Sequence, residues 1–173
     1  MLFIKIMPHI HLELQINAPI ERCFDLARSI DLHKLSTGNT QEEAIAGTTT
    51  GLIGLNETVT WRAKHFGVWQ KLTSKITEFE RPHFFVDEML DGAFKSIYHK
   101  HAFTPHPQPF SEGRGEQSAT IMTDDFHFES PLGILGSIAN KLVLTKYLTD
   151  LLTERNRMIK EFAETERWRE VVK

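Results

Sequence analysis

Residues 56–79, which read NETVTWRAKHFGVWQKLTSKITEF, alternate between two kinds of side chain. One face of the first half carries Glu57, Val59, Trp61, Ala63 and His65. Gly67 interrupts the pattern, and the second half turns Val68, Leu72 and Ile76 to the inside. Alternation with a period of two on both sides of a glycine predicts two antiparallel strands, each buried on one face.

The strand signal continues to residue 129. A third strand, HFFVDEML at residues 83–90, has no fixed inward face because two phenylalanines are adjacent in it. Two more strands are FKSIYHKHAF at residues 94–103 and ATIMTDDFHFES at residues 119–130, with a Pro- and Gly-rich loop between them. Turns are expected at Arg81-Pro82 and, as a two-residue hairpin, at Asp91-Gly92.

The segment before residue 56 predicts a strand, two short helices and a further short strand. Residues 9–16 alternate cleanly, with isoleucine and leucine inside and His9 and His11 outside. Pro19 suits the first position of a helix, and Asp31 is expected to cap a second helix that ends near residue 35. A short strand is expected near residues 41–46.

The C-terminal quarter predicts one long helix. Apolar residues recur at helical spacing over about residues 132–164, and no proline interrupts them. The last residues, about 165–173, are charged and are expected to fray. This order predicts an α+β fold in one domain over residues 1–173, with a curved antiparallel sheet of about seven strands wrapped on the C-terminal helix and two short helices after strand 1.

Composition excludes several classes of protein. The net charge of −3 offers no basic surface for nucleic acid. One cysteine, Cys23, rules out an intrachain disulfide and fits a reducing compartment. The apolar N-terminus is too short to span a membrane, so we expect a cytoplasmic protein with no stable membrane insertion. About residues 1–7 are expected to form an N-terminal extension, and residues 1–6 would precede the start if Met7 is the first residue; the sequence leaves the choice between Met1 and Met7 open.

Several segments resemble the SRPBCC superfamily of START-like, pollen-allergen-like and polyketide-cyclase-like helix-grip proteins. They are APIERCFDLARSIDLHK, the stretch from ETVTWRAKHF to DEMLDGAF, HKHAF, and DDFHFESPLGILG. The resemblance covers roughly residues 9–165 and is nearest to small bacterial members of unassigned function. It implies the helix-grip fold and a hydrophobic tunnel between sheet and helix. The superfamily includes lipid carriers, quinone binders, hormone receptors, cyclases and chaperone cofactors, and none of their activities has a motif that maps onto this chain.

His99 and His101 raise the main functional question, because the strand pattern turns both inward beside Ile97 and Phe103. They are either cavity-wall histidines bonded to neighbours, an anchor for a ligand's polar group, or a metal site. A metal site needs further ligands, for which Asp124, Glu57 and His65 are the inward candidates. We favour the first two interpretations and expect neither metal nor cofactor.

Asp124 is the expected partner of His99. It shares a face with apolar residues, and a buried carboxylate needs a hydrogen-bond donor. If Ile97 lies opposite Phe126, then His99 lies opposite Asp124 and His101 opposite Met122. The loop between these strands is too long to fix that register.

The predicted function is the binding or carrying of a hydrophobic small molecule, such as a lipid, an isoprenoid or an aromatic metabolite. The expected cavity residues are Glu57, Val59, Trp61, Ala63, Leu72, Ile97, His99, His101, Phe103, Asp124, Phe126, Phe128, Ile138 and Leu142. No catalytic residue is assigned, and an enzyme is the less favoured alternative. It would be of cyclase or dehydrase type, with His99, His101 and Asp124 moving protons. A protein–protein interaction module is a third alternative, and the protein is expected to be a monomer or a homodimer.

Overall fold

A computed structural model describes residues 8–106, 118–130 and 138–172. Seven strands form one antiparallel sheet in the order β1-β7-β6-β5-β4-β3-β2. The long helix α3 follows the last strand, and two short α-helices and two 3-10 helices (η1 and η2) complete the described chain. The elements are β1 (His9–Ile16), α1 (Ile20–Ala27), α2 (Ile30–Ser36), η1 (Gly38–Thr40), β2 (Glu43–Gly47), β3 (Thr58–His65), β4 (Val68–Glu80), β5 (Phe84–Gly92), β6 (Ser96–His106), β7 (Ala119–Glu129), α3 (Ile138–Ala163) and η2 (Glu166–Glu170).

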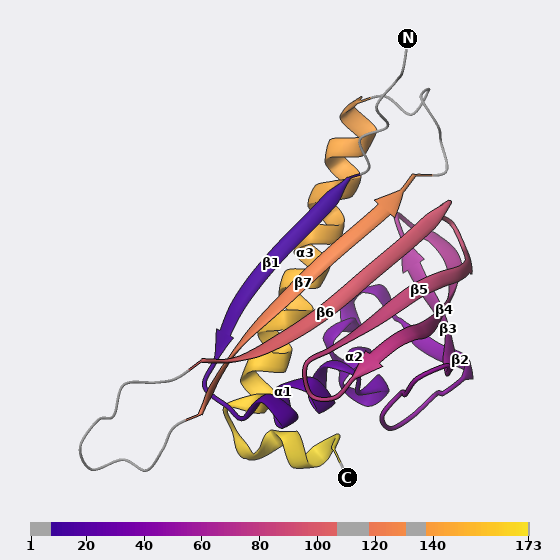
Figure 1. Ribbon diagram of the computed structural model, residues 1–173. Coiled ribbons are helices and arrows are strands. Elements are labelled where there is room, and N and C mark those ends of the chain that lie inside the picture. Colours follow the sequence, from indigo (N-terminus) through magenta and orange to yellow (C-terminus); the bar gives the residue numbers. More distant parts are fainter. Residues whose placement is uncertain (1–7, 107–117, 131–137, 173) are drawn as a thin grey trace.

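The helices gather on one side of the sheet. Figure 1 shows α3 running along β1, β7 and β6, while α1, α2 and η2 lie around its C-terminal end. The strands from β5 to β2 curve round beside α2. This is the helix-grip arrangement, so the predicted fold class is confirmed.

The alternating pattern forms strands for the predicted reason. Along β6 every second residue from Ile97 to Phe103 is buried, and the residues between them are partly exposed. Along β3 the buried residues are Val59, Trp61 and Ala63. Because side chains alternate across a strand, one face of each strand packs under the helices and the other meets solvent.

Two apolar clusters form the core under the sheet. The larger one joins α1, the C-terminal half of α3 and the sheet, and Phe24 meets Phe79, Phe85 and Phe103 edge-on at its centre. The smaller one, built on β1, β6 and β7, packs against the side of α3 that carries Leu148. The C-terminal end of α3 is therefore anchored more deeply in the core than its first described turns.

Some local predictions differ from the structure. Ser29, not Asp31, caps α2, since its Oγ accepts from the N–H of Leu32 at 3.2 Å. Asp91 and Gly92 belong to β5, because Gly92 still pairs with Leu72, and residues 93–95 make the connection. The side chain of Val68 is exposed rather than inward.

The ends of the chain also differ from expectation. In place of a frayed tail, residues 166–170 form η2, and Val171 is buried against the core. The predicted helix over 132–164 is observed from residue 138 to residue 163; its earlier part lies outside the described residues, as does the N-terminal extension.

Candidate functional site

A cavity of about 200 Å³ lies between the sheet and α3. Most of its wall is apolar, with Val59 and Trp61 from β3, Ile97 from β6, and Leu148 and Leu152 from α3. A second hollow of about 470 Å³ adjoins it toward the first described turns of α3 and shares His65, Phe94 and Leu148 with it. Of these two volumes, that of the second hollow falls within the range typical of small-molecule sites, about 300–1,000 Å³, and that of the first is smaller.

His99 and His101 project into this cavity wall from neighbouring inward positions of β6. Both are buried, and their rings lie 3.7 Å apart between centroids. His99 Nε2 is 3.0 Å from Asp124 Oδ1, and His101 Nδ1 is 2.6 Å from the same oxygen. The predicted contact between His99 and Asp124 is therefore present.

The register that brings them together is not the predicted one. His101, not His99, lies directly opposite Asp124, and His99 lies opposite Phe126. A shift by two residues keeps every inward side chain inward. Asp124 consequently sits within reach of both imidazoles rather than of one.

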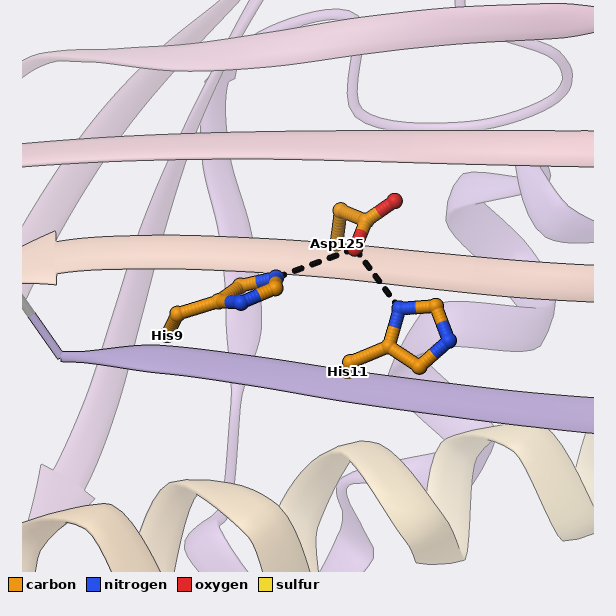
Figure 2. Close-up of side chains that lie close together, drawn as sticks. All are labelled: His9, His11 and Asp125. Carbon is orange, nitrogen blue, oxygen red and sulfur yellow. Dashed lines mark hydrogen bonds and ion pairs between the residues drawn. The ribbon is translucent and has the colours of Figure 1, made fainter.

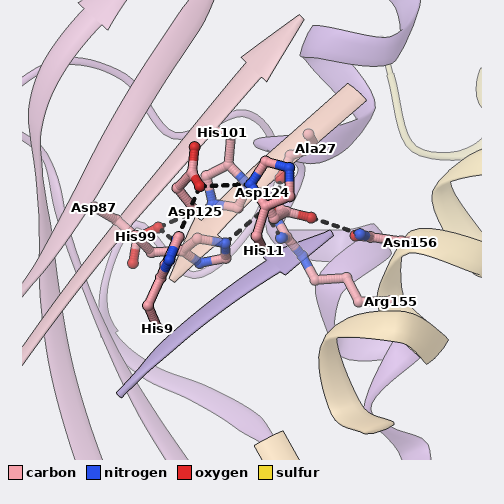
Figure 3. A network of polar contacts seen from close by, with 10 residues as sticks. All are labelled: His9, His11, Ala27, Asp87, His99, His101, Asp124, Asp125, Arg155 and Asn156. Atoms are coloured by element: carbon pink, nitrogen blue, oxygen red, sulfur yellow. Dashed lines mark hydrogen bonds and ion pairs between the residues drawn. The ribbon is translucent and has the colours of Figure 1, made fainter. Parts of the chain in front are cut away.

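Three residues that the sequence analysis did not select complete the cluster (Figure 3). Asp87 of β5 lies 3.1 Å from His101 Nε2 through its Oδ2. Arg155 of α3 donates to the carbonyl of Ala27 at 2.6 Å, and its Nη1 is 3.4 Å from His101 Nδ1. Asn156 Nδ2 donates to Asp124 Oδ2 at 2.5 Å. We call Asp87, His99, His101, Asp124, Arg155 and Asn156 the buried polar cluster.

The pKa values in the cluster follow from burial and charge. Burial alone would raise the pKa of Asp124, but His101 and His99 outweigh it and hold that pKa well below its ordinary value. For Asp87, burial is likewise outweighed by the His101 hydrogen bond and by His99, and its pKa is lowered. Burial, and then the neighbouring His101, lower the pKa of His99, although Asp124 acts in the opposite direction. Both carboxylates are thus ionised at neutral pH.

A charge count shows what the cluster can do chemically. Two carboxylates and the Arg155 guanidinium leave one negative charge, so one additional proton on the imidazole pair makes the cluster neutral. His101 Nδ1 pairs with Asp124 when it carries a proton and accepts from Arg155 when it does not. The cluster can therefore hold and move a proton at the cavity wall.

A second group of polar residues, His33, Glu42 and His65, also lines the cavity. His33 stacks on Trp61 at 4.2 Å and lies 3.4 Å from a carboxylate oxygen of Glu42. Burial alone would raise the pKa of Glu42, but His33 outweighs it and holds that pKa below its ordinary value. His65 Nδ1 is 2.7 Å from the Tyr147 hydroxyl, and burial lowers the pKa of His65.

The structure places the predicted cavity residues unequally. Those that line the cavity are Val59, Trp61, Leu72, Ile97, His99, His101 and Phe126. Ala63 lines a smaller hollow beside it. Phe103 and Phe128 pack into the apolar core instead. Asp124 is fully buried behind the histidines. Ile138 begins the described part of α3, and its side chain is not among those that the structure describes.

Two predicted residues face solvent instead. Glu57 is exposed at the start of β3, where its carboxylate accepts from the N–H of Gly54 at 2.6 Å. Leu142 is 67% exposed. It lies six residues before Leu148 in the sequence, and this spacing is not a whole number of helical turns, so the two side chains project from different faces of α3.

Asp87, His99 and His101 offer ligand atoms within 4.8 Å of one another, as a metal site would require. The guanidinium of Arg155 stands beside His101, however, and repels a divalent cation. Each carboxylate of the cluster already has partners within it, namely the imidazoles for both and Asn156 for Asp124, so the cluster is better suited to a neutral polar group than to a metal ion. In the described part of the chain, no helix combines the length and apolar character needed to cross a membrane.

Comparison with known proteins identifies the fold. The protein TTHA0849 from Thermus thermophilus is similar with a TM-score of 0.62 and 19% identity, over 88% of this chain and 97% of that one. Ginseng major latex-like protein 151 from Panax ginseng gives 0.59 and 13%, over 92% and 99%. A START superfamily protein from Mycobacterium smegmatis gives 0.61 and 10%, over 89% and 98%. These likenesses show the helix-grip fold, while no family model and no curated protein matches the sequence.

Proposed function

We propose that this protein binds a small hydrophobic molecule between the sheet and α3, with the ligand's polar group at His99 and His101. The observation that supports this most directly is the combination of an apolar cavity with a buried polar cluster in its wall. Sites for small molecules typically combine apolar walls with a few placed polar groups that orient the ligand. A filled core would have favoured an interaction module instead.

The cluster favours a particular kind of ligand. Asp87 lines the cavity and Asp124 lies directly behind the histidines. These two carboxylates outnumber the single Arg155 guanidinium, so a ligand carboxylate would meet net repulsion there. A hydroxyl or a carbonyl can exchange hydrogen bonds with the imidazoles without adding charge. We therefore propose an apolar molecule with one neutral oxygen function, such as an isoprenoid alcohol, an aromatic ketone or a neutral lipid, rather than a free fatty acid.

Two measurements test the binding. Native mass spectrometry of protein purified without delipidation should show a bound mass that is released on denaturation. Trp61 lines the cavity, and its fluorescence should change with hydrophobic ligands when Trp69 and Trp168 are replaced by phenylalanine. Absence of both signals, in protein shown to be folded, would contradict the proposal.

A matched pair of variants on α3 locates the ligand. Leu148→Phe adds volume at the cavity wall, whereas Leu142→Phe adds the same volume at an exposed position. Overpacking costs about 1–3 kcal/mol, so Leu148→Phe should weaken binding roughly tenfold or more, and Leu142→Phe should leave it unchanged. Equal effects of the two changes would place the ligand outside the cavity.

A cyclase- or dehydrase-type enzyme is the second candidate, which the paired histidines and carboxylates favour. A group that donates or accepts a proton must face the substrate, and both His99 and His101 line the cavity. Incubation with hydroxylated aromatic or polyketide-like compounds, followed by mass spectrometry, separates the two functions. A binder returns the compound unchanged, whereas a dehydrase returns it without a water molecule and loses that activity in His99→Gln.

A further inference from the structure

A second histidine cluster lies on the outer face of the sheet, separate from the cavity. In the pairing of β1 with β7, His11 lies opposite Asp125 and His9 lies opposite His127. All four residues point away from the buried face, since the buried residues between them are Ile10, Asp124 and Phe126. Two adjacent strands thus present three imidazoles and one carboxylate on one side.

Three of these side chains already converge on one point (Figure 2). His9 Nε2 is 3.0 Å from Asp125 Oδ1, and His11 Nδ1 is 2.8 Å from the same oxygen. One potential ligand atom from each residue lies within 4.8 Å of the others. His11 and Asp125 are directly paired on β1 and β7, and His9 is two residues from His11 on the same strand, so the sheet fixes the backbone from which each donor projects.

We propose that His9, His11 and Asp125 bind a divalent transition-metal ion, with Zn²⁺ as the best chemical match. Imidazole nitrogen and carboxylate oxygen are the donors that this class of ion prefers. Tetrahedral Zn²⁺ with bonds of about 2.0–2.1 Å separates its ligands by about 3.4 Å. The distances from Asp125 Oδ1 to His9 Nε2 and His11 Nδ1, 3.0 and 2.8 Å, are slightly shorter than this, so side-chain rotations would be needed to admit the ion.

Neighbouring groups support the site. The ring of His127 stacks on that of His9 with centroids 4.2 Å apart and an angle of 3°, which holds His9 in place. Glu13 adds negative potential near His11. Lys100 lies opposite Asp125 on β6, but its Nζ is placed over the ring of Phe84 at 4.5 Å.

This site contrasts with the buried polar cluster, which also contains a triad of possible ligands. There, Arg155 supplies a competing positive charge. On the outer face the side chains of His9, His11 and Asp125 are 42%, 54% and 34% exposed. The ion can therefore enter directly and keep water in its remaining position. Bound there, it links the edge strand β1 to β7.

The test uses the full chain without a histidine tag, treated with a chelator and then dialysed. Zn²⁺ is titrated against a chromophoric chelator, and Co²⁺ is titrated while its d–d absorption is recorded. We expect one ion per chain in the wild type. His11→Gln or Asp125→Asn should weaken binding by more than about tenfold, because loss of even a supporting group costs about 10–100-fold. His83→Gln, at another exposed histidine, should have no effect.

Two further measurements identify the ligands. In ¹⁵N–¹H spectra of the histidine rings, Zn²⁺ should shift Nε2 of His9 and Nδ1 of His11 and leave His99 and His101 unchanged. Zn²⁺ should also raise the Tm of the wild type but not of Asp125→Asn. Binding that survives in both outer-face variants, or that is lost only in His99→Gln, would overturn the proposal, as would the absence of stoichiometric binding.

Discussion

Asp124 and Asp125 show how one residue step changes the role of the same side chain. They are adjacent on β7, and each contacts two histidines. Asp124 is fully buried behind the cavity wall, whereas Asp125 is about one-third exposed on the outer face. Because successive residues of a strand point to opposite faces, the DD pair serves two separate sites.

Replacing Asp124 or Asp125 separately should change the pKa of a different histidine in each case. Burial and His101 lower the pKa of His99 while the Asp124 carboxylate opposes them, so Asp124→Asn should lower that pKa further. Asp125→Asn should instead lower the pKa of His11, which its hydrogen bond to Asp125 raises. NMR titration of the histidine ring protons measures both.

Each variant is the control for the other. His99 should be unaffected by Asp125→Asn, and His11 by Asp124→Asn. An unchanged His99 pKa in Asp124→Asn would mean that the two side chains do not interact in solution. The buried Asp124 carboxylate would then have to be stabilised by its other neighbours.

For single residues, the sequence predicted the contact between His99 and Asp124 correctly but not the register between β6 and β7. The need of a buried carboxylate for a donor was enough to connect Asp124 with His99. The register was wrong by two residues, because hydrophobic alternation repeats every two residues and cannot distinguish such shifts. The long loop between β6 and β7 supplied no turn geometry to correct it.

At the scale of the elements, α3 contributes polar residues to an otherwise apolar stripe. Leu148, Leu152, Ile159 and Phe162 recur at steps of three, four and seven along the helix and face the sheet. Arg155 falls within this series and is buried, with Asn156 beside it. An arginine within an apolar stripe is the sequence signal that could have identified the cluster's helical members.

Arg155 connects three elements, and its removal should destabilise the protein. It caps the C-terminal end of α1 through the Ala27 carbonyl and approaches His101 on β6. Arg155→Met keeps most of the length of the side chain but leaves a buried carbonyl without its donor. We expect a loss of about 2–3 kcal/mol in the free energy of unfolding, measured by urea denaturation.

Arg157→Met is the matched change on the exposed side of the same helix. Arg157 pairs with Glu154 at the surface, and such pairs contribute at most about 1 kcal/mol. A similar loss for both variants would show that Arg155 acts only through helix propensity. Asp87 could not be found in the same way, since the adjacent phenylalanines of β5 concealed which face is buried.

For the whole molecule, the element order alone predicted the helix-grip fold, because a sheet with one apolar face needs the only long helix as its cover. The cavity is harder to predict, since it depends on which inward side chains meet. Phe103 and Phe128 close on the core, whereas Ile97 and Phe126 from the same two strands leave space. The alternating pattern predicts on which face of the sheet a side chain lies, but it does not predict how much empty space remains beside that side chain.

Burial of the polar cluster should make the whole fold sensitive to acid, in two stages. The pKa of His99 is lower in the folded protein than its ordinary value of about 6.5. The folded state therefore binds fewer protons than the unfolded state once the pH falls below about 6.5, and stability present above that pH is lost toward the lower folded pKa. Asp124 and Asp87 also have lowered pKa values, so a second loss begins below about pH 3.9.

Urea denaturation between neutral pH and about pH 3 measures both stages. The free energy of unfolding should decrease first between about pH 6.5 and the folded pKa of His99, and His99→Gln should remove this first decrease while keeping the second. His83→Gln, at an exposed histidine, should retain both. If stability instead rises as the pH falls from about 7 to about 5, His99 is protonated more readily in the folded state than in the unfolded one. The folded protein would then favour a protonated, positively charged His99, and a ligand carboxylate would be a better partner for the cavity than a neutral oxygen.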